Sequence, residues 1–331
     1  MQLGAILSYG AYLVCEFFIY VILTVGLNIQ FGLAGIPNFT FITFVAVGAY
    51  ITGVTGLSAP PAGSGIHYIL GLSLPFPLTL LAGTVAAAIL GFLLGLAGLR
   101  RFRGTYLAIV TFGFGFIAYD AITNYPSIFD GFNGIAGVAP PLNDVLQISY
   151  EYYPFAFAVI SGIAMLVTLL LAHRIRESGL GRTLRAIRED PESAEALGKN
   201  AFRFQLVAMV VGCALAGLGG GLLIELVSAT NPAAWLPPET FIVYAALLVG
   251  GTGNTWGAVL GAFLVPILFV EGSRFIPVPS QYAIQFAALR LMVVGVLIIV
   301  VLWFRPKGAL PEPRKVFGSR PEAGRMNRSS D

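Results

Sequence analysis

The first 99 residues carry a single charged side chain, Glu16, and this gap in charge most restricts what the chain can form. A water-soluble domain needs charged side chains over its whole surface, whereas a surface in contact with lipid excludes them. Of all 331 residues only 11% are charged and 57% are hydrophobic. Soluble domains are typically about 25% charged and about 45–50% apolar. The sequence therefore predicts an all-α, polytopic transmembrane helical bundle.

Apolar runs of the length that a membrane helix needs, about 20 residues at 1.5 Å each, recur along the chain. They are predicted at 4–26, 33–56, 75–98, 105–124, 154–173, 204–227 and 283–304. Two pieces, 240–250 and 256–271, flank the segment Gly250–Asn254 and are each short for a full crossing. We interpret them as a broken or re-entrant pair, which brings the total to about 8–10 membrane segments.

The loops differ in their content of lysine and arginine, which predicts their side of the membrane. Basic residues gather in the loop around 100–103, in 174–203 and after 304, so these parts are expected in the cytoplasm. The segment 125–153 carries Asp130, Asp144 and Glu151 but no lysine or arginine, so it is expected outside. Counting spans backwards then places the N-terminus outside. The membrane domain is predicted at 1–305 and a polar, loose cytoplasmic tail at 306–331.

The segment 174–203 holds seven basic and five acidic residues and is the least membrane-like internal part. Asp190 followed by Pro191 suits a helix start, and Gly198 suits the position just past a helix end. Ala194 and Leu197 are predicted to share one helix face. The segment is therefore predicted to hold two short amphipathic helices under the membrane, although an ordinary solvated run of positive charge would look similar.

No pattern of catalytic residues stands out. The phosphate-binding loop, the metalloprotease motif and the serine-hydrolase motif are all absent, and His67 and His173 are expected on opposite sides of the membrane. The two cysteines, Cys15 and Cys213, each lie in an apolar run and are interpreted as buried thiols. An enzyme is disfavoured on these grounds.

Charged residues inside membrane spans are costly and often functional. Glu16 lies centrally in the first predicted span, but no basic partner is evident, so it suggests a polar cavity or a helix contact before a proton relay. Asp120 and Glu225 lie near outer ends of spans, where reaching interfacial water is at least as good an interpretation as transport.

Two breaks in apolar runs, at Gly32–Thr40 and at Gly250–Asn254, combine glycine with asparagine. Paired breaks of this kind point to a substrate path near the middle of the membrane, because helix ends expose free backbone groups there. Close helix packing is the alternative, and it is preferred for three pairs at small-xxx-small spacing: Gly91/Gly95, Gly217/Gly221 and Gly257/Gly261.

Several motifs resemble those of the branched-chain amino-acid ABC transporter permease family, in particular its LivM type. The first is Gly181–Asp190 followed by Ala194–Gly198. The others are Leu27-Asn28 with Gly32–Gly35, Gly48–Tyr50, Arg103–Thr111, Asn133–Ile135, Gly250–Gly261 with its repeated glycines, and Phe304–Gly308. The run Arg103-Gly104-Thr105-Tyr106 is what separates the LivM type from its sister permease. Two departures, Thr40-Phe41 after Asn38-Phe39 and the run Phe129–Phe132, fall in the predicted substrate path or its outer mouth.

The resemblance implies a permease subunit of an ATP-driven importer in the inner or plasma membrane. Its implied partners are ABC ATP-binding subunits, a second homologous permease and a periplasmic or extracellular solute-binding protein, with no nucleic acid. No cofactor is expected in this chain, since ATP and Mg²⁺ would bind the partner subunits. The substrate would be a branched-chain or other hydrophobic amino acid. The alternatives are the same machine for urea or short amides, and a stand-alone secondary transporter.

The resemblance also assigns two sets of residues. The loop that couples to the ATPase would use Arg182, Arg185, Arg188, Glu189, Asp190, Ala194, Glu195, Ala196 and Gly198. The substrate path, between the two permeases, would use Asn28, Gly35, Asn38, Thr40, Thr111, Asn133, Gly251 and Asn254. No catalytic residue and no metal ligand is expected.

Overall fold

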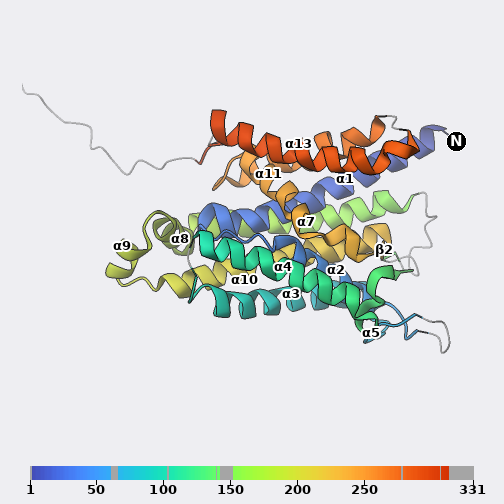
Figure 1. The fold of residues 1–331 in the computed structure, drawn as a ribbon, viewed down its shortest axis with the longest axis horizontal. Coiled ribbons are helices and arrows are strands. Elements are labelled where there is room, and N and C mark those ends of the chain that lie inside the picture. The colour runs from blue at the N-terminus through green and yellow to red at the C-terminus, as the bar shows by residue number, and fades with distance from the viewer. Residues whose placement is uncertain are drawn as a thin grey trace, which may run out of the picture.

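The computed structural model describes residues 2–60, 66–102, 104–138, 140–141, 152–276, 279–305 and 307–312. Arg103, Asp144, Glu151 and residues 313–331 lie outside the described part of the chain, so the predictions that concern them are not addressed by the structure. The helices run roughly along the long axis of the molecule (Figure 1). An all-α helical bundle is thereby confirmed.

Six helices of the described part are long and apolar enough to cross a membrane. They are α1 (Gln2–Leu27) with its π-helical continuation η1 (Asn28–Leu33), α3 (Phe76–Gly98), α4 (Thr105–Asn124), α7 (Tyr153–Glu177), α10 (Ala201–Val227), and α12 (Thr255–Ala262) with its continuations η5 (Phe263–Glu271) and η6 (Gly272–Phe275). Three further apolar helices are α2 (Phe41–Gly56), α11 (Thr240–Gly250) and α13 (Ala283–Phe304).

Short elements connect these helices. They are α5 (Pro126–Phe129), η2 (Gly131–Asn133), β1 (Ile135–Ala136), α8 (Gly179–Glu189), α9 (Pro191–Ala196), β2 (Ala229–Thr230), η3 (Pro232–Trp235), η4 (Pro237–Glu239) and η7 (Ser280–Tyr282). Strands β1 and β2 pair antiparallel, with Ile135 opposite Thr230. A Cβ on Gly134 would overlap the Thr230 carbonyl oxygen, so this approach requires glycine.

Two predicted spans differ from the structure. The span predicted at 33–56 is wrong at its start, because the first helix continues to Leu33 and α2 begins only at Phe41. The intervening residues, including Pro37, form the predicted break. The piece predicted at 256–271 is longer than expected, because η5 and η6 extend α12 to Phe275 and give a 21-residue apolar segment. Of the two predicted pieces, α11 remains short, with 11 residues.

Helix α10 lies at the centre and packs against α1, α2 and α3. Glycines allow these close approaches. A Cβ on Gly217 would lie 3.0 Å from the Gly83 carbonyl oxygen, and one on Gly91 would lie 2.6 Å from Cys213 Cβ. Such distances are below van der Waals contact. The predicted packing role of these small-xxx-small pairs is therefore confirmed.

The two acidic side chains Glu16 and Glu225 are both buried, at 6% and 3% exposure. Glu16 accepts a hydrogen bond from the Tyr12 hydroxyl at 3.2 Å, and Glu225 accepts one from the Thr79 hydroxyl at 3.4 Å. Glu225 does not reach interfacial water, so that interpretation is wrong. Its carboxylate instead lies between α10 and α3, where a buried polar group needs a partner.

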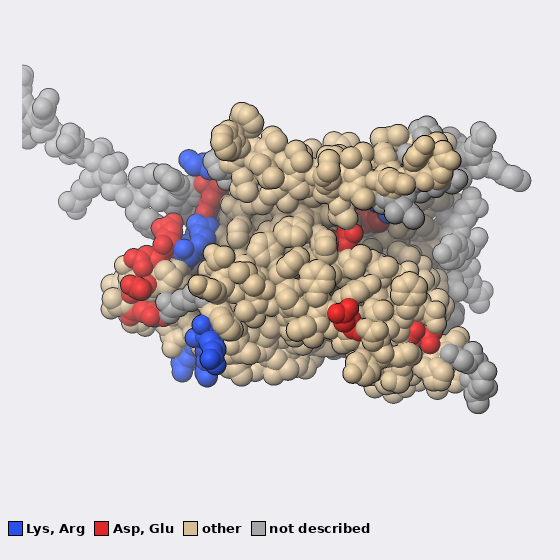
Figure 2. Space-filling view, in the orientation of Figure 1, with Lys and Arg blue, Asp and Glu red and all other residues tan. Residues whose placement is uncertain are grey.

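Both ends of the bundle carry distinct features. Helices α8 and α9 project from the end where α3, α7 and α13 terminate, which we call the α8–α9 end (Figure 1). The N-terminus and the β1–β2 pair lie at the opposite end. Lysine and arginine gather at the α8–α9 end and acidic residues cover its tip, while the middle of the molecule is almost free of charge (Figure 2).

Candidate functional site

Helices α8 and α9 form a rigid unit at the end of α7 and the start of α10. Only Ser178 separates α7 from α8, and its hydroxyl accepts a bond from the Gly181 N–H at 3.4 Å. Leu184 and Ile187 of α8 are both fully buried. Ala194 of α9 is 4% exposed and packs with Ile187 in a small apolar cluster. The two predicted amphipathic helices are therefore confirmed.

Both ends of α9 are capped by local hydrogen bonds. Asp190 accepts from the N–H groups of Glu192 and Ser193 at 3.0 and 3.2 Å. A hydrogen bond from the Ser193 hydroxyl, together with these backbone bonds, lowers the pKa of the Asp190 carboxyl. Gly198, at φ 77°, donates to the Glu195 carbonyl at 2.9 Å and ends the helix in a Schellman motif. A six-residue helix would not persist without such caps.

The outward face of this unit carries charge around one apolar side chain. Arg182, Glu189, Asp190, Glu192, Glu195 and Ala196 are exposed there. Leu197 is 81% exposed whereas Ala194 is 4% exposed, so the prediction that the two share one helix face is wrong. Helix α9 ends at Ala196, and Leu197 follows as its C-cap.

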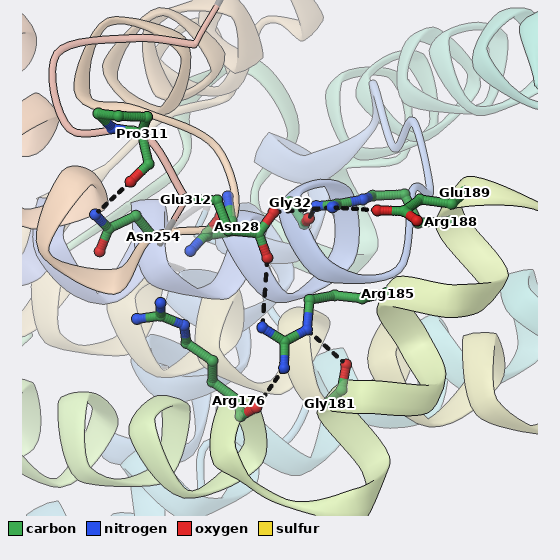
Figure 3. Close-up of polar contacts among 11 residues, drawn as sticks. Asn28, Gly32, Arg176, Gly181, Arg185, Arg188, Glu189, Asn254, Pro311 and Glu312 are labelled. Atoms are coloured by element: carbon green, nitrogen blue, oxygen red, sulfur yellow. Dashed lines mark hydrogen bonds and ion pairs between the residues drawn. The ribbon is translucent and has the colours of Figure 1, made fainter. Parts of the chain in front are cut away.

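Two arginines of α8 point away from that face and into the protein (Figure 3). The Arg188 guanidinium bonds to Glu312 at 2.9 Å and donates to the Gly32 carbonyl. Arg185 lies 3.5 Å from the same carboxylate and donates to the Arg176 carbonyl at 3.2 Å. Although both were predicted for ATPase coupling with the rest of the loop, the structure places them in internal contacts.

Part of the predicted substrate path gathers around Arg188. Asn28 Oδ1 accepts from the Gly253 N–H at 2.8 Å, and Asn254 caps α12 by accepting from the Trp256 N–H at 3.1 Å. Gly251 has φ 122°, and a Cβ on Gly35 would lie 2.9 Å from Arg188 Cγ. We call the set Asn28, Gly32, Arg185, Arg188, Gly253, Asn254 and Glu312 the junction (Figure 3). It lies at the α8–α9 end of the bundle.

A second group of the predicted path residues lies at the start of α2. Thr111 accepts from the Phe39 N–H at 3.2 Å, and Asn38 accepts from the Thr40 N–H at 3.2 Å. The Ile42 N–H is bonded by Thr240, the first residue of α11, also at 3.2 Å. The first N–H groups of a helix have no partner within it, and lipid provides none. These side chains therefore make a helix start possible inside the bundle.

The neighbours of this second group show how deep in the bundle the start of α2 lies. A Cβ on Gly115, at the middle of α4, would lie 3.2 Å from the Thr40 hydroxyl and 3.5 Å from Pro237. The starts of α2 and α11 thus meet near the middle of a span. Helix starts carry partial positive charge from their N–H groups. This is the arrangement that broken helices provide around substrates in transporters.

Sequence reasoning missed two residues that hold this group together. Gln30 donates to the Met209 carbonyl at 2.9 Å and accepts from Asn38 Nδ2 at 2.9 Å. Thr240 caps α2 from 198 positions away. An amide in the middle of an apolar run was the available signal for Gln30. For Thr240 the sequence gives no signal, because its partner is distant in the chain.

Hollows lie on both sides of the α2 start. One, of about 340 Å³, opens at the α8–α9 end and is lined by Ala34–Pro37, Leu107 and Arg188 among others. The other is small and is lined by Thr43, Tyr50, Tyr119 and Trp235 among others. Phe39, which precedes α2, stacks on Tyr244 with ring centroids 4.8 Å apart. Asn133, the remaining predicted path residue, is exposed in η2 at the opposite end, away from both groups.

A bundle of spanning helices with broken helices inside and a rigid charged unit at one end defines a membrane transport permease. The chain belongs to the family described as branched-chain amino acid transport system / permease component, whose model matches residues 10–302.

Comparison with individual relatives shows which type of permease within the family this chain is similar to. The chain is 30% identical over 316 residues to the high-affinity branched-chain amino acid transport system permease protein LivM of Salmonella typhimurium, covering 89% of this chain and 68% of the relative. It is 28% identical over 331 residues to the probable LivM of Methanocaldococcus jannaschii, covering 89% and 91%. The similarity to LivH of Salmonella typhimurium is 26% over 311 residues, covering 90% and 93%. The predicted LivM type is confirmed. No solved structure matches this chain.

Proposed function

We propose that this chain is the membrane subunit of an ATP-driven importer for branched-chain or other hydrophobic amino acids. The observation that carries the proposal is the α8–α9 unit. Its inner face is anchored by the fully buried Leu184 and Ile187, and its outer face presents Leu197 within a charged rim. A unit fixed in this way to α7 and α10 can pass a force applied at its surface to two spans.

The proposed importer needs partner subunits, because a permease component is one part of a transport system. The importer would comprise ATP-binding subunits docked on the α8–α9 unit, a second homologous permease and an external solute-binding protein. The α8–α9 end would face the cytoplasm, in agreement with its basic residues. The opposite end, with β1–β2 and Asn133, would then receive the binding protein, and the N-terminus would lie outside.

The start of α2 is the proposed substrate contact on this chain. Its hydroxyl and amide groups, from Asn38, Thr40 and Thr111, could bind the charged ends of an amino acid. The neighbouring rings of Phe39 and Tyr244 suit an apolar side chain. The substrate class itself rests on the names of the relatives, which are branched-chain amino acid permeases. Urea or a short amide has no apolar side chain to place against these rings.

The docking surface can be tested with one substitution and a matched control. Leu197→Asp places a charge at the exposed centre of the surface, whereas Leu72→Asp makes the same change at a residue that is 52% exposed at the opposite end. Each tagged variant would be purified in mild detergent with its co-encoded partners. We expect the ATP-binding subunit to be lost with Leu197→Asp and retained with Leu72→Asp.

Two other outcomes would contradict parts of the proposal. If wild type purifies without any ATP-binding subunit and still transports in ATP-free liposomes, the importer proposal is wrong. A stand-alone secondary transporter would then replace it. If the ATP-binding subunit binds Leu197→Asp as well as wild type, the importer stands but the docking surface lies elsewhere.

A further inference from the structure

The segment that follows α13 packs against the turn between α11 and α12. The Ala309 N–H donates to the Val249 carbonyl at 2.8 Å, and the Leu310 N–H donates to the Gly250 carbonyl at 2.9 Å. Asn254 Nδ2 donates to the carbonyls of Leu310 and Pro311, both at 3.2 Å. We call Gly308–Glu312 the strap. The expectation of a loose tail is wrong for these residues.

Glycines permit this close contact. Gly251 has φ 122° and Gly308 has φ 70°, both in the region that favours glycine. A Cβ on Gly251 would lie 2.9 Å from the Leu310 carbonyl carbon, and one on Gly253 would lie 2.7 Å from Glu312 Oε2. Two of the glycines in the family motif Gly250–Gly261 therefore make room for the strap.

The strap ends on α8 through a partly buried carboxylate. Glu312 bonds to Arg188 at 2.9 Å and lies 3.5 Å from Arg185, and its side chain is 21% exposed. Arg188 in turn donates to the Gly32 carbonyl at the end of η1. Asn28, one turn earlier, accepts from Gly253 at 2.8 Å. One carboxylate thus connects α8 with the α11–α12 turn and, through Arg188, with the end of the first helix (Figure 3).

If an ATP-binding subunit moves α8, only helices connected to α8 can move with it. Helices α7 and α10 are joined to α8–α9 by the chain itself. Helices α11 and α12 are not, and α11 begins at the proposed substrate contact through Thr240. The strap supplies a direct connection between the α8–α9 unit and this half of the bundle, beside the link through the end of the first helix.

Resting on the proposed function, we propose that Glu312 is a positioning residue that transmits movement of α8 to the α11–α12 turn through the strap. Glu312 touches neither substrate nor ATP. Its role is to keep the two halves of the permease moving together when the ATP-binding subunits close.

The test compares three variants in the assembled transporter, reconstituted in liposomes with its ATP-binding and solute-binding partners. Glu312→Gln removes the charge at nearly constant volume, and Glu312→Asp keeps the charge with a shorter reach. Lys307→Gln is the matched control, because Lys307 is an exposed charged residue just before the strap. The readout is substrate taken up per ATP hydrolysed.

With Glu312→Gln, we expect ATP-binding subunits to remain bound, ATP hydrolysis to stay within about twofold, and uptake per ATP to fall about tenfold. A charge-assisted hydrogen bond contributes to an equilibrium on the order of tenfold. Glu312→Asp should recover part of the ratio, and Lys307→Gln should match wild type. A second variant, Ala309→Pro, removes a strap N–H donor without changing charge and should lower the ratio in the same way.

Three outcomes would overturn the inference. They are an unchanged uptake per ATP with Glu312→Gln, an equal loss with Lys307→Gln, and a parallel loss of assembly and uptake that Glu312→Asp does not relieve. The last would show a purely structural role. All three require that wild type binds its ATP-binding subunit and hydrolyses ATP. A failure at that earlier step would instead refute the proposed function.

Discussion

Replacing Gly261 with alanine should separate α11 from α12. A Cβ on Gly261 would overlap the Ala246 carbonyl oxygen, and it would lie 2.7 Å from the Ala246 carbonyl carbon and 3.1 Å from the Gly250 nitrogen. Carbon atoms in contact are normally about 3.5–4.0 Å apart, so the helices would have to move by about 1 Å. All these neighbouring atoms belong to the backbone, so no change of side-chain rotamer can relieve the overlap.

The magnitude follows from that geometry. Adding a methyl group to a well-packed site typically costs about 1–3 kcal/mol, and a backbone overlap belongs at the upper end of this range. A cost of about 3 kcal/mol changes an equilibrium constant by more than about a hundredfold. The cost falls on the contact between α11 and α12 that also presents the turn to the strap. Stability and uptake should therefore both decrease.

The assay is thermal inactivation of the purified subunit in detergent, with Gly113→Ala as the matched control. Gly113 lies in the middle of α4 with no atom within 4 Å of a Cβ placed on it. Alanine is the better helix former by about 1 kcal/mol in water, so this control should be neutral or slightly stabilising. We expect Gly261→Ala to inactivate at a temperature several degrees lower. Equal inactivation temperatures for the two variants would refute the reasoning.

Three further predictions follow. Asn38→Ala leaves Gln30 Oε1 and the Thr40 N–H without their Asn38 partner, so the free energy of unfolding should fall by about 1–3 kcal/mol. Unchanged uptake per folded transporter would remove Asn38 from the substrate path. Thr111→Val removes the acceptor for the Phe39 N–H and should destabilise by a similar amount in thermal inactivation, whereas Thr111→Ser should not. Hydrogen bonding lowers the pKa of Asp190, so its cap is present above the ordinary aspartate pKa and lost only as pH falls through the lowered value. Binding of the ATP-binding subunit should thus be constant from pH 8 to about 5, weakened at every pH by Asp190→Ala and preserved by Asp190→Asn.

The sequence alone determined most of the membrane helices and the place of the α8–α9 unit in the chain. The predicted span at 105–124 and the short piece at 240–250 coincide with α4 and α11. Continuous apolar runs identify such helices because lipid satisfies no backbone group, so the property is local. The same holds for α9, since Asp190, Pro191 and Gly198 act within a few residues of where they stand.

What only the tertiary structure decided is which polar groups meet. The predicted path residues divide between the junction with its neighbours Gly35 and Gly251, the start of α2, and η2, because several of them bond to groups far away in the sequence. Asn28 reaches Gly253, and Arg188 reaches Glu312, 124 residues later. Leu197 is exposed although Ala194, three residues earlier, is buried. Apolar residues occur on nearly every face of the membrane helices, so the pattern of apolar residues does not encode these pairings. Close glycine contacts and the need to satisfy buried backbone groups select them once the helices pack.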